Sequence, residues 1–441
     1  MISGLLRSGA IYTAANFLAA GVPFLLLPIL TRALAPAEYG RVISFFMIVP
    51  LCGALAGLGL QSAVGVRWLA QDKGDPRSYT SSALFVIGSS TVFTAALAAL
   101  VGVWLDLGLS PLEWALAAMT SGAMTIQAVR FTVWQSKGRA LPAAALQVAS
   151  SVLNILLSLL GVLVLHLGAT GRIGGAVLAC LAIAAFSMLA FRRESIGARP
   201  SGHDCKELLR FGLPLVPHVA AGVVFSSVDR FAVSAQMGTE ALGIYGVAAQ
   251  IGMIMSVLAD AAVKAYFPTL YRILGRSSLQ GRLRIVGLTY LSMPFWLLVA
   301  FAAWGALLLC GGLLLGDRYV AALPLAIWFL VGGAINGIYL NISALFFFTG
   351  RTEWISASTL TAAGTAALLA PWAVAQWGLV GAAVSYCVAQ GALLSAAWLV
   401  SQRVYPMPWR HAGVAVRLLL RGARPKRLRA GVNGRQPRSA C

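Results

Sequence analysis

The chain has 441 residues, of which 59% are apolar and only 10% are charged. A soluble domain usually carries about 25% charged residues and at most about half apolar ones, so this composition excludes an ordinary soluble protein. The apolar residues fall in many separate runs, each about long enough to cross roughly 30 Å of hydrocarbon. We therefore predict an all-α polytopic membrane protein.

The apolar runs predict twelve transmembrane helices. The first run is too long for a signal peptide and lacks a small-residue cleavage pattern, so we interpret it as the first helix. After the last helix, residues 403–441 are rich in Arg, Pro and Gly and are predicted to form a disordered basic tail. The predicted helices are 8–30, 42–66, 80–104, 112–135, 142–166, 173–191, 211–233, 243–267, 284–314, 320–348, 354–375 and 379–402.

The Lys and Arg residues gather on one side of the predicted bundle. With the N-terminus inside, 28 of the 33 fall on the inner side and five on the outer side. This bias follows the positive-inside rule and predicts that both termini are cytoplasmic. It also explains most of the net charge of +20, so the charge indicates topology and contact with anionic lipids, not nucleic-acid binding. The five outer residues are Arg32, Arg41, Arg172, Arg230 and Arg318.

Short phrases recur about half a chain length apart. TGRIGGAVLAC at 170–180 matches WGLVGAAVSYC at 377–387, and two further loops match at offsets of 203 and 212 residues. Each half contains an even number of predicted helices, so both halves enter the membrane in the same orientation, with a site expected between them. We expect two parallel six-helix repeats, residues 1–200 and 201–402. Chance likeness between Gly- and Ala-rich loops is the alternative.

Three stretches carry a resemblance to a known family. They are LPILTRALAPAEYGRVISF from the end of the first helix into the second, LGLQSAV in the second, and LLRFGLPLVPHVAAGVVFSSVDRFAVSAQMGTEALGIYGVAAQIG across the seventh and eighth. The third is the most specific, with Arg-Phe-Gly-Leu-Pro at its start and Asp229-Arg230-Phe231 further along. Over residues 8–402 the chain resembles the polysaccharide-biosynthesis flippases, whose superfamily also holds multidrug extruders and the lipid II flippase.

The resemblance implies a V-shaped, extruder-like transporter in the inner membrane. Its expected cargo is an oligosaccharide unit on a polyprenyl pyrophosphate, moved to the outer leaflet for exopolysaccharide, O-antigen or capsule synthesis. Lipid II flippases usually have fourteen helices, so twelve favour the polysaccharide branch. Because no cytoplasmic domain is predicted, a separate polysaccharide polymerase and glycosyltransferases are the expected protein partners, with membrane lipids around the chain.

The motifs of catalysis are missing from the sequence. It contains no Gly-Lys pair for a Walker A loop and no His-Glu-x-x-His, and its four histidines are scattered. The predicted outer loops are short and nearly uncharged, so they offer little to a glycosyltransferase or polymerase. We predict no catalytic, metal or cofactor site, and hence a protein that is not an enzyme.

Charged residues at membrane depth are costly and often mark transport pathways. We expect Arg67, Arg130 and Lys264 to bind the pyrophosphate. Asp260, four residues before Lys264 and on the same helical face, is expected to tune or couple transport. As alternatives, Arg67 and Arg130 reach inner head groups, and Asp260 with Lys264 forms a structural ion pair.

A second group of residues is predicted to couple or gate transport. Prolines in the first and seventh helices remove backbone hydrogen bonds and can bend a helix. Residues 229 and 230 are adjacent, so they point to different sides of their helix, and Arg230 alternatively anchors to outer lipid. His218 either senses protons or is a packed histidine. The group comprises Asp260, Asp229, Arg230, His218, Pro23, Pro28, Pro214 and Pro217.

Two other functions remain open at this point. A multidrug or cation extruder of the same superfamily needs an acidic cavity, and Asp260 is the one deep acid that the sequence suggests. The other is a non-transporting scaffold of a polysaccharide assembly complex. The polar residues along the predicted helices argue against it, because a scaffold does not need them. We favour a water-filled cationic cavity between halves that rock to expose it alternately.

Overall fold

The computed structural model describes residues 15, 19, 21–70, 75–194, 196, 200–276 and 278–420, and all regular secondary structure in them is helical. Eight helices are long and apolar enough to span a membrane. Two of these bend sharply, α9 (Val216–Gly275) at Gly238 and α12 (Glu353–Val404) at Gly378. When both arms of each bent helix, helix Gly21–Ala33 and α5 (Pro111–Ser136) are counted, the described residues contain the twelve predicted segments.

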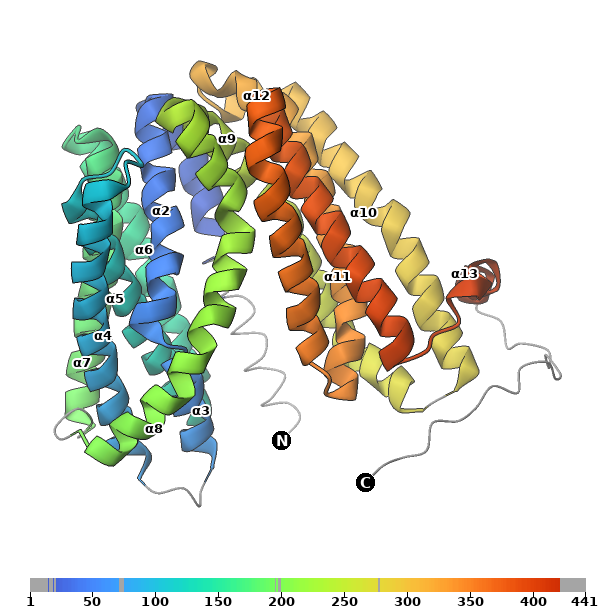
Figure 1. Ribbon diagram of the computed structural model, residues 1–441, viewed down its shortest axis with the longest axis horizontal. Coiled ribbons are helices and arrows are strands. Elements are labelled where there is room, and N and C mark those ends of the chain that lie inside the picture. Colours follow the sequence, from blue (N-terminus) through green and yellow to red (C-terminus); the bar gives the residue numbers. More distant parts are fainter. Residues whose placement is uncertain are drawn as a thin grey trace.

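The first half forms one group of helices in Figure 1. Local sequence signals start several of them: Asp75 accepts hydrogen bonds from the backbone N–H groups ahead of it, and Ser110 forms a capping box with Glu113. Besides helix Gly21–Ala33 and α5, the group comprises α2 (Pro36–Gly57), α3 (Leu60–Leu69), α4 (Pro76–Trp104), α6 (Ala140–Leu159), the π-helical turn η1 (Leu160–Val164) and α7 (Gly168–Arg193).

The second half begins with a short amphipathic helix and ends with another short helix. Figure 1 shows α10, α11 and α12 as a second group, with the first arm of α9 (216–237) between the groups. Its elements are α8 (Gly202–Gly212), η2 (Leu213–Leu215), α9, α10 (Leu279–Leu314), η3 (Asp317–Ala322), α11 (Leu323–Thr349), α12, η4 (Trp409–His411) and α13 (Ala412–Leu420).

The two groups meet at one end of the molecule and diverge toward the other, which gives the predicted V shape (Figure 1). The bends of α9 and α12 lie at the end where the groups meet. We call this the outer end and the opposite one the inner end, after the predicted orientation.

A pair of glycines lets the halves touch at the outer end. A Cβ on Gly40 would lie 1.8 Å from the carbonyl oxygen of Thr239, and a Cβ on Gly243 would lie 2.0 Å from that of Pro36. Backbones come this close only where no side chain intervenes. The two contacts are equivalent, because residues 36 and 239, like residues 40 and 243, are one repeat offset of 203 apart. This symmetry supports the parallel repeats.

Hydrogen bonds reinforce the same seam. The backbone N–H of Gly316 donates to Thr31 Oγ1 at 3.2 Å, and the Tyr319 hydroxyl donates to the Leu34 carbonyl at 3.1 Å. These bonds join the end of helix Gly21–Ala33 to the loop and turn before α11. The outer end is therefore closed by packing and by hydrogen bonds.

Two predicted helix boundaries are wrong. The second helix breaks at Leu58 and Gly59, which both have positive φ, and continues as α3. The seventh helix begins at Val216, not at 211. Pro214 lies in the 3-10 turn η2 and Pro217 in the first turn of α9, so these prolines mark the break between α8 and α9 and not a kink within the seventh helix. Pro23 and Pro28 do lie within helix Gly21–Ala33, whose preceding residues are largely outside the described part.

The start of the basic tail is ordered, contrary to prediction. A Cβ on Gly287 of α10 would lie 2.5 Å from the Ala415 carbonyl oxygen of α13, so the two helices pack closely. The Tyr290 hydroxyl donates to the Trp409 carbonyl at 3.3 Å, and Trp409 is buried. The start of the tail contains apolar side chains although the tail as a whole is basic and polar, and these side chains explain the packing. Residues 421–441 lie outside the described part of the chain.

Candidate functional site: a cationic cavity

A cavity of about 490 Å³ lies in the first half and is closed on one side by α9. Apolar residues of helix Gly21–Ala33 and α2 form much of its wall. Its charged lining residues are Arg172 and Arg230, and the described residues that line it include no carboxylate. The cavity is therefore cationic. Its other polar lining residues are Tyr39, Thr120, Gln127, Ser150, Ser151, Asn154, Cys180 and Gln250.

The glycines of the repeated phrase place Arg172 in this cavity. A Cβ on Gly171 would lie 2.4 Å from the carbonyl oxygen of Gly161, and one on Gly175 would lie 2.6 Å from the backbone of Leu157. The end of α6 and the start of α7 can therefore pack against each other. In the second copy of the phrase, a Cβ on Gly381 would lie 1.9 Å from the Ala373 carbonyl oxygen. Both copies thus allow two antiparallel segments to pack closely.

Arg172 lies in the first turns of α7 and is buried, with 8% of its surface exposed. Its Nη1 donates to Ser158 Oγ at 2.9 Å and to Asn154 Oδ1 at 3.2 Å, while its Nε has no partner among the described residues. The guanidinium also lies 4.8 Å from the centre of the Phe46 ring. These partners are neutral, so the positive charge is held in place without being compensated. A buried charge of this kind favours an anionic ligand.

Arg230 and Asp229 lie on the first arm of α9 and face opposite ways, as predicted. Arg230 lines the cavity, and its Nη1 donates to the Ser226 carbonyl at 3.1 Å. Asp229 is buried; its Oδ2 accepts a hydrogen bond of 2.6 Å from the Tyr245 hydroxyl, and its Oδ1 has no partner among the described residues. One helix thus presents a cation to the cavity and an acid to the second half.

Two hydrogen bonds of Gln250 connect the two halves at the cavity wall. The Tyr39 hydroxyl of α2 donates to Gln250 Oε1 of α9 at 2.9 Å. Gln250 Nε2 in turn donates to the Pro23 carbonyl at 2.5 Å. Pro23 therefore contributes a backbone acceptor at the interface of the halves.

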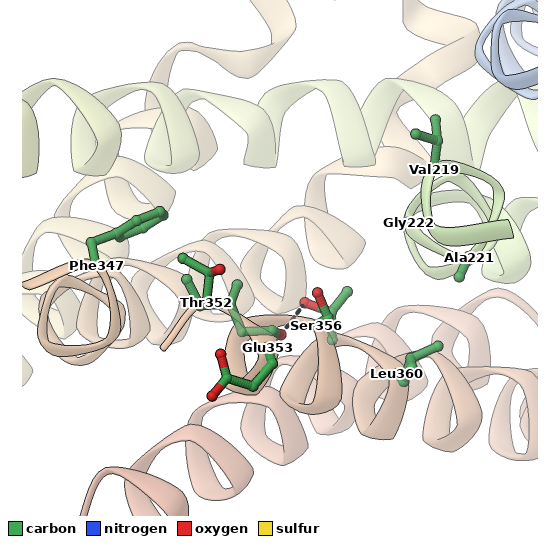
Figure 2. A pocket seen from close by; sticks show the side chains of 10 residues that line it. Val219, Ala221, Gly222, Phe347, Thr352, Glu353, Ser356 and Leu360 are labelled. Atoms are coloured by element: carbon green, nitrogen blue, oxygen red, sulfur yellow. Dashed lines mark hydrogen bonds between the residues drawn. The ribbon is translucent and has the colours of Figure 1, made fainter. Parts of the chain in front are cut away.

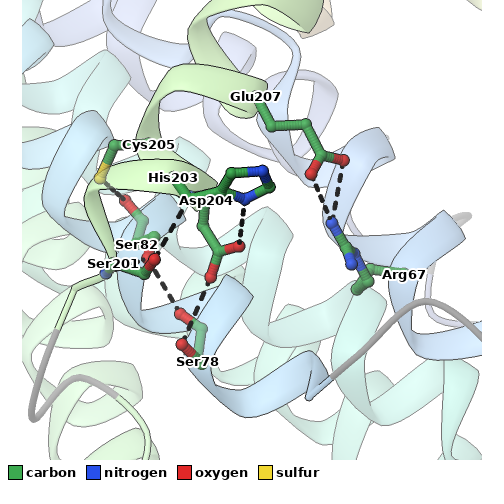
Figure 3. Close-up of polar contacts among 8 residues, drawn as sticks. All are labelled: Arg67, Ser78, Ser82, Ser201, His203, Asp204, Cys205 and Glu207. Carbon is green, nitrogen blue, oxygen red and sulfur yellow. Dashed lines mark hydrogen bonds and ion pairs between the residues drawn. The ribbon is translucent and has the colours of Figure 1, made fainter.

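Arg67, a predicted ligand of the pyrophosphate, is placed at the inner end. Its Nη2 lies 2.8 Å from Glu207 of α8, and its guanidinium carbon lies 3.9 Å from the centre of the Tyr79 ring. Figure 3 shows this pair beside Asp204, which accepts a hydrogen bond of 3.3 Å from Ser78 of α4. These contacts attach α8, the first helix of the second half, to the first half.

Arg130, a second predicted ligand, is almost completely buried. Its Nη2 lies 2.5 Å from Glu194, which also pairs with Lys137 at 2.6 Å, and its guanidinium carbon lies 4.0 Å from the centre of the Trp134 ring. Burial alone would raise the pKa of Glu194, but the hydrogen bonds and charges of Arg130 and Lys137 lower it below its ordinary value. In this conformation the cluster has the character of a structural ion pair.

The structure does not bring the predicted ligands together. Arg67 and Arg130 belong to separate ion pairs, neither lines the cavity, and Asp260 is exposed on the second arm of α9. The side chains of Lys264 and His218 lie outside the described part of the chain. Instead, the cavity is lined by Arg172 and Arg230, which were both predicted to be among the outer arginines. Arg172 was predicted to precede the helix that starts at 173, and that placement is wrong because it lies within α7. Arg230 lies within a helix, as predicted.

Comparison with known proteins gives a matching family model and two similar proteins. Residues 5–274 match the family model described as polysaccharide biosynthesis protein. An uncharacterized membrane protein of Haemophilus influenzae is 25% identical over 363 residues, which cover 80% of this chain and 86% of the relative. The Lsg locus putative protein 1 of the same organism is 23% identical over 360 residues, covering 79% and 86%.

Solved structures show the same fold. An inward-facing multidrug resistance MATE family transporter of the MOP superfamily aligns with a TM-score of 0.65 at 15% identity, over 89% of this chain and 94% of its own. The lipid II flippase MurJ, in an inward closed conformation, aligns with a TM-score of 0.63 at 13% identity, over 96% and 94%. These two alignments show that the chain has the fold of these membrane proteins. Because the family model covers more than half of the sequence, the chain belongs to the polysaccharide biosynthesis protein family.

Proposed function

We propose that this protein is a flippase that moves a polyprenyl-pyrophosphate-linked oligosaccharide from the cytoplasmic to the outer leaflet of the inner membrane, for exopolysaccharide, O-antigen or capsule synthesis. The observation that carries the proposal is the cavity whose charged lining residues are Arg172 and Arg230 and whose described lining includes no carboxylate. Such a cavity suits an anion and opposes a cation.

The chemistry of the cavity matches the head of such a cargo. A bare pyrophosphate in hydrocarbon is costly, and guanidinium groups bind phosphate oxygens with two parallel hydrogen bonds. The amides and hydroxyls of Gln127, Ser150 and Asn154 line the same cavity and can hydrogen-bond to sugar hydroxyls. We therefore assign pyrophosphate binding to Arg172 and Arg230.

The previously expected ligands take other roles in this proposal. Arg67 and Arg130 stabilise the inner end through Glu207 and Glu194. Lys264, close to the inner end of the second arm of α9, is kept as a candidate for first contact with the cargo, with Asp260 as its modulator. Asp229, buried behind Arg230, is the candidate for coupling the cavity to movement of the second half.

The proposed mechanism is alternating access by two parallel repeats, with both termini in the cytoplasm. The outer end is closed by the Gly40 and Gly243 contact. With the orientation predicted from the Lys and Arg bias, we assign this conformation to the state that loads from the cytoplasm. Opening of this seam and closure of the inner end would release the head outside. An inside-negative potential favours outward movement of an anion by about 2.3 kcal/mol per charge per 100 mV, so no coupling ion is required. A polymerase and glycosyltransferases would make and use the cargo.

The test is reconstitution of the purified protein in liposomes that contain a polyprenyl-pyrophosphate oligosaccharide with a fluorescent head. We expect the head to cross the bilayer, and faster when the side that it leaves is negative. Transport of cationic dyes in place of this carrier would overturn the proposal in favour of an extruder. Protein that moves neither, in liposomes where a known flippase moves the carrier, would favour a scaffold.

A further inference from the structure

A second hollow, separate from the cationic cavity, lies in the second half. This groove has a volume of about 610 Å³, and its walls come from the first arm of α9, the end of α11 and the start of α12. Figure 2 shows these three elements around it. Its apolar lining residues are Val219, Ala221, Gly222, Phe347, Ile355 and Leu360.

The polar groups of the groove leave its surface largely apolar. The Thr359 hydroxyl donates to the Ile355 carbonyl of its own helix at 2.9 Å, so its need for a partner is met there. The carboxylate of Glu353, at the start of α12, is turned away from Val219 and Gly222 in Figure 2. Phe347 and Leu360 are exposed. The groove can therefore hold a hydrocarbon chain, and its volume is in the range of about 300–1,000 Å³ of small-molecule sites.

One helix connects this groove to the cationic cavity. Val219 and Arg230 are eleven residues apart on the first arm of α9, and the non-helical backbone of α9 lies at Gly238, beyond both. Eleven residues make about three turns, so both side chains lie on nearly the same face, roughly 16 Å apart along the axis. An amphiphile with its anionic group at Arg230 can thus place its chain along the groove.

We propose that this groove binds the isoprenoid chain of the cargo next to its pyrophosphate, an inference that rests on the proposed function. Hydrocarbon gains little by leaving lipid for an apolar groove, because both environments are equally apolar. The occupant is therefore selected through its link to the anion and not through affinity for the groove. The carrier satisfies this condition through its pyrophosphate. The phosphate of a membrane phospholipid shares this chemistry, and the labelling experiment below distinguishes the two.

Filling the groove tests the proposal. A Cβ on Gly222 would meet no atom within 4 Å, so Gly222→Trp can fill the space, and the same holds for Gly305 of α10, which lies outside the groove and gives the matched control Gly305→Trp. In liposomes, Gly222→Trp is expected to slow a long-chain carrier about tenfold and a short-chain carrier by no more than about twofold, as a chain displaced from its path predicts. Gly305→Trp should move both at wild-type rates. Equal rates of the long-chain carrier in Gly222→Trp and wild type would overturn the proposal.

A second measurement does not depend on transport. A pyrophosphate carrier with a photoreactive group in its chain should label the α9, α11 and α12 segments of the groove in wild-type protein and in Gly305→Trp, but not in Gly222→Trp. Labelling confined to other segments, or equal labelling by a photoreactive phospholipid, would refute the groove as the site of the chain. Wild-type protein that moves neither carrier would refute the flippase proposal instead, while the labelling pattern would still decide the groove.

Discussion

Arg130 and Arg172 are two buried arginines of the first half in opposite electrical settings. Arg130 at the inner end lies 2.5 Å from the carboxylate of Glu194. Arg172 in the cavity is held by the neutral oxygens of Ser158 and Asn154, at 2.9 and 3.2 Å. Burial is therefore a poor guide to function here, and the charge of the partner is a better one. A compensated arginine holds helices together, whereas an uncompensated arginine remains able to bind an anion.

The largest expected effect is on stability and comes from breaking the compensated pair. Arg130→Met removes one of the two cationic partners of a partly buried carboxylate. Breaking a buried pair completely costs about 3–5 kcal/mol of unfolding free energy, and because Lys137 remains we expect a cost near the lower end of this range. Thermal unfolding in detergent should show a clear fall in Tm, and Arg130→Met combined with Glu194→Gln should recover part of it. Transport per folded molecule should stay near wild type. Unchanged Tm with lost transport would show that Arg130 belongs to the pathway.

The next effect is on transport and comes from removing the uncompensated charge. Arg172→Ala deletes charge-assisted hydrogen bonds to the pyrophosphate, worth about 1.5–3 kcal/mol, so head crossing should slow by about 10- to 100-fold. Arg172→Lys should restore only part of the rate, because an ammonium lacks the planar fork of the guanidinium. Tm should change little. Crossing at the wild-type rate in Arg172→Ala would remove this residue from the site.

A smaller effect on transport is expected when Arg172 is given a charged partner, like the one that Arg130 has. Asn154→Asp keeps the shape of the side chain but places a carboxylate beside Arg172, as Glu194 does beside Arg130. We expect carrier crossing to slow by about tenfold, because like charges repel the pyrophosphate and the cation is occupied. The neutral variant Asn154→Ala controls for the lost hydrogen bond. Faster crossing in Asn154→Asp than in Asn154→Ala would contradict a cationic site.

The smallest effect concerns pH. The lowered pKa of Glu194 means that its pairs with Arg130 and Lys137 contribute stability above its ordinary value of 4.5. This contribution is lost as the pH falls through the still lower pKa of the folded state. Tm measured from pH 7 downward should therefore fall less steeply in Glu194→Gln than in wild type. Parallel curves would show that another acid controls the acid sensitivity.

Much of the fold could be predicted from the sequence, because run length and the Lys and Arg bias depend on local composition. The V shape and the polysaccharide-biosynthesis family came from the resemblance, and the structure and the family model confirm them. The site was harder to predict. Glu207 lies 140 residues from Arg67, so their pairing has no local signal. Arg172 was placed in a loop because the sixth helix was started at 173, five residues later than its observed start at Gly168.

One signal for the site was present in the sequence and was not used. The glycines around Arg172 indicated close packing of two helices, and a cation inside such a packed hairpin faces the bundle and not the solvent. The orientation of Arg230 depended on where α9 lies between the halves, which is a tertiary property. Helix existence is thus readable from one sequence, whereas the face that each helix presents requires the assembled bundle.

The most direct test of the central claim is the binding of a polyprenyl-pyrophosphate carrier to the protein in nanodiscs, compared across three variants. We predict that Arg172→Ala with Arg230→Ala weakens binding by about a hundredfold or more, as the loss of two charged ligands implies. Arg67→Ala and Arg130→Met should bind like wild type once folded protein is counted. Undiminished binding in the double cavity variant, with loss in Arg67→Ala, would place the anion site at the inner end and contradict the account.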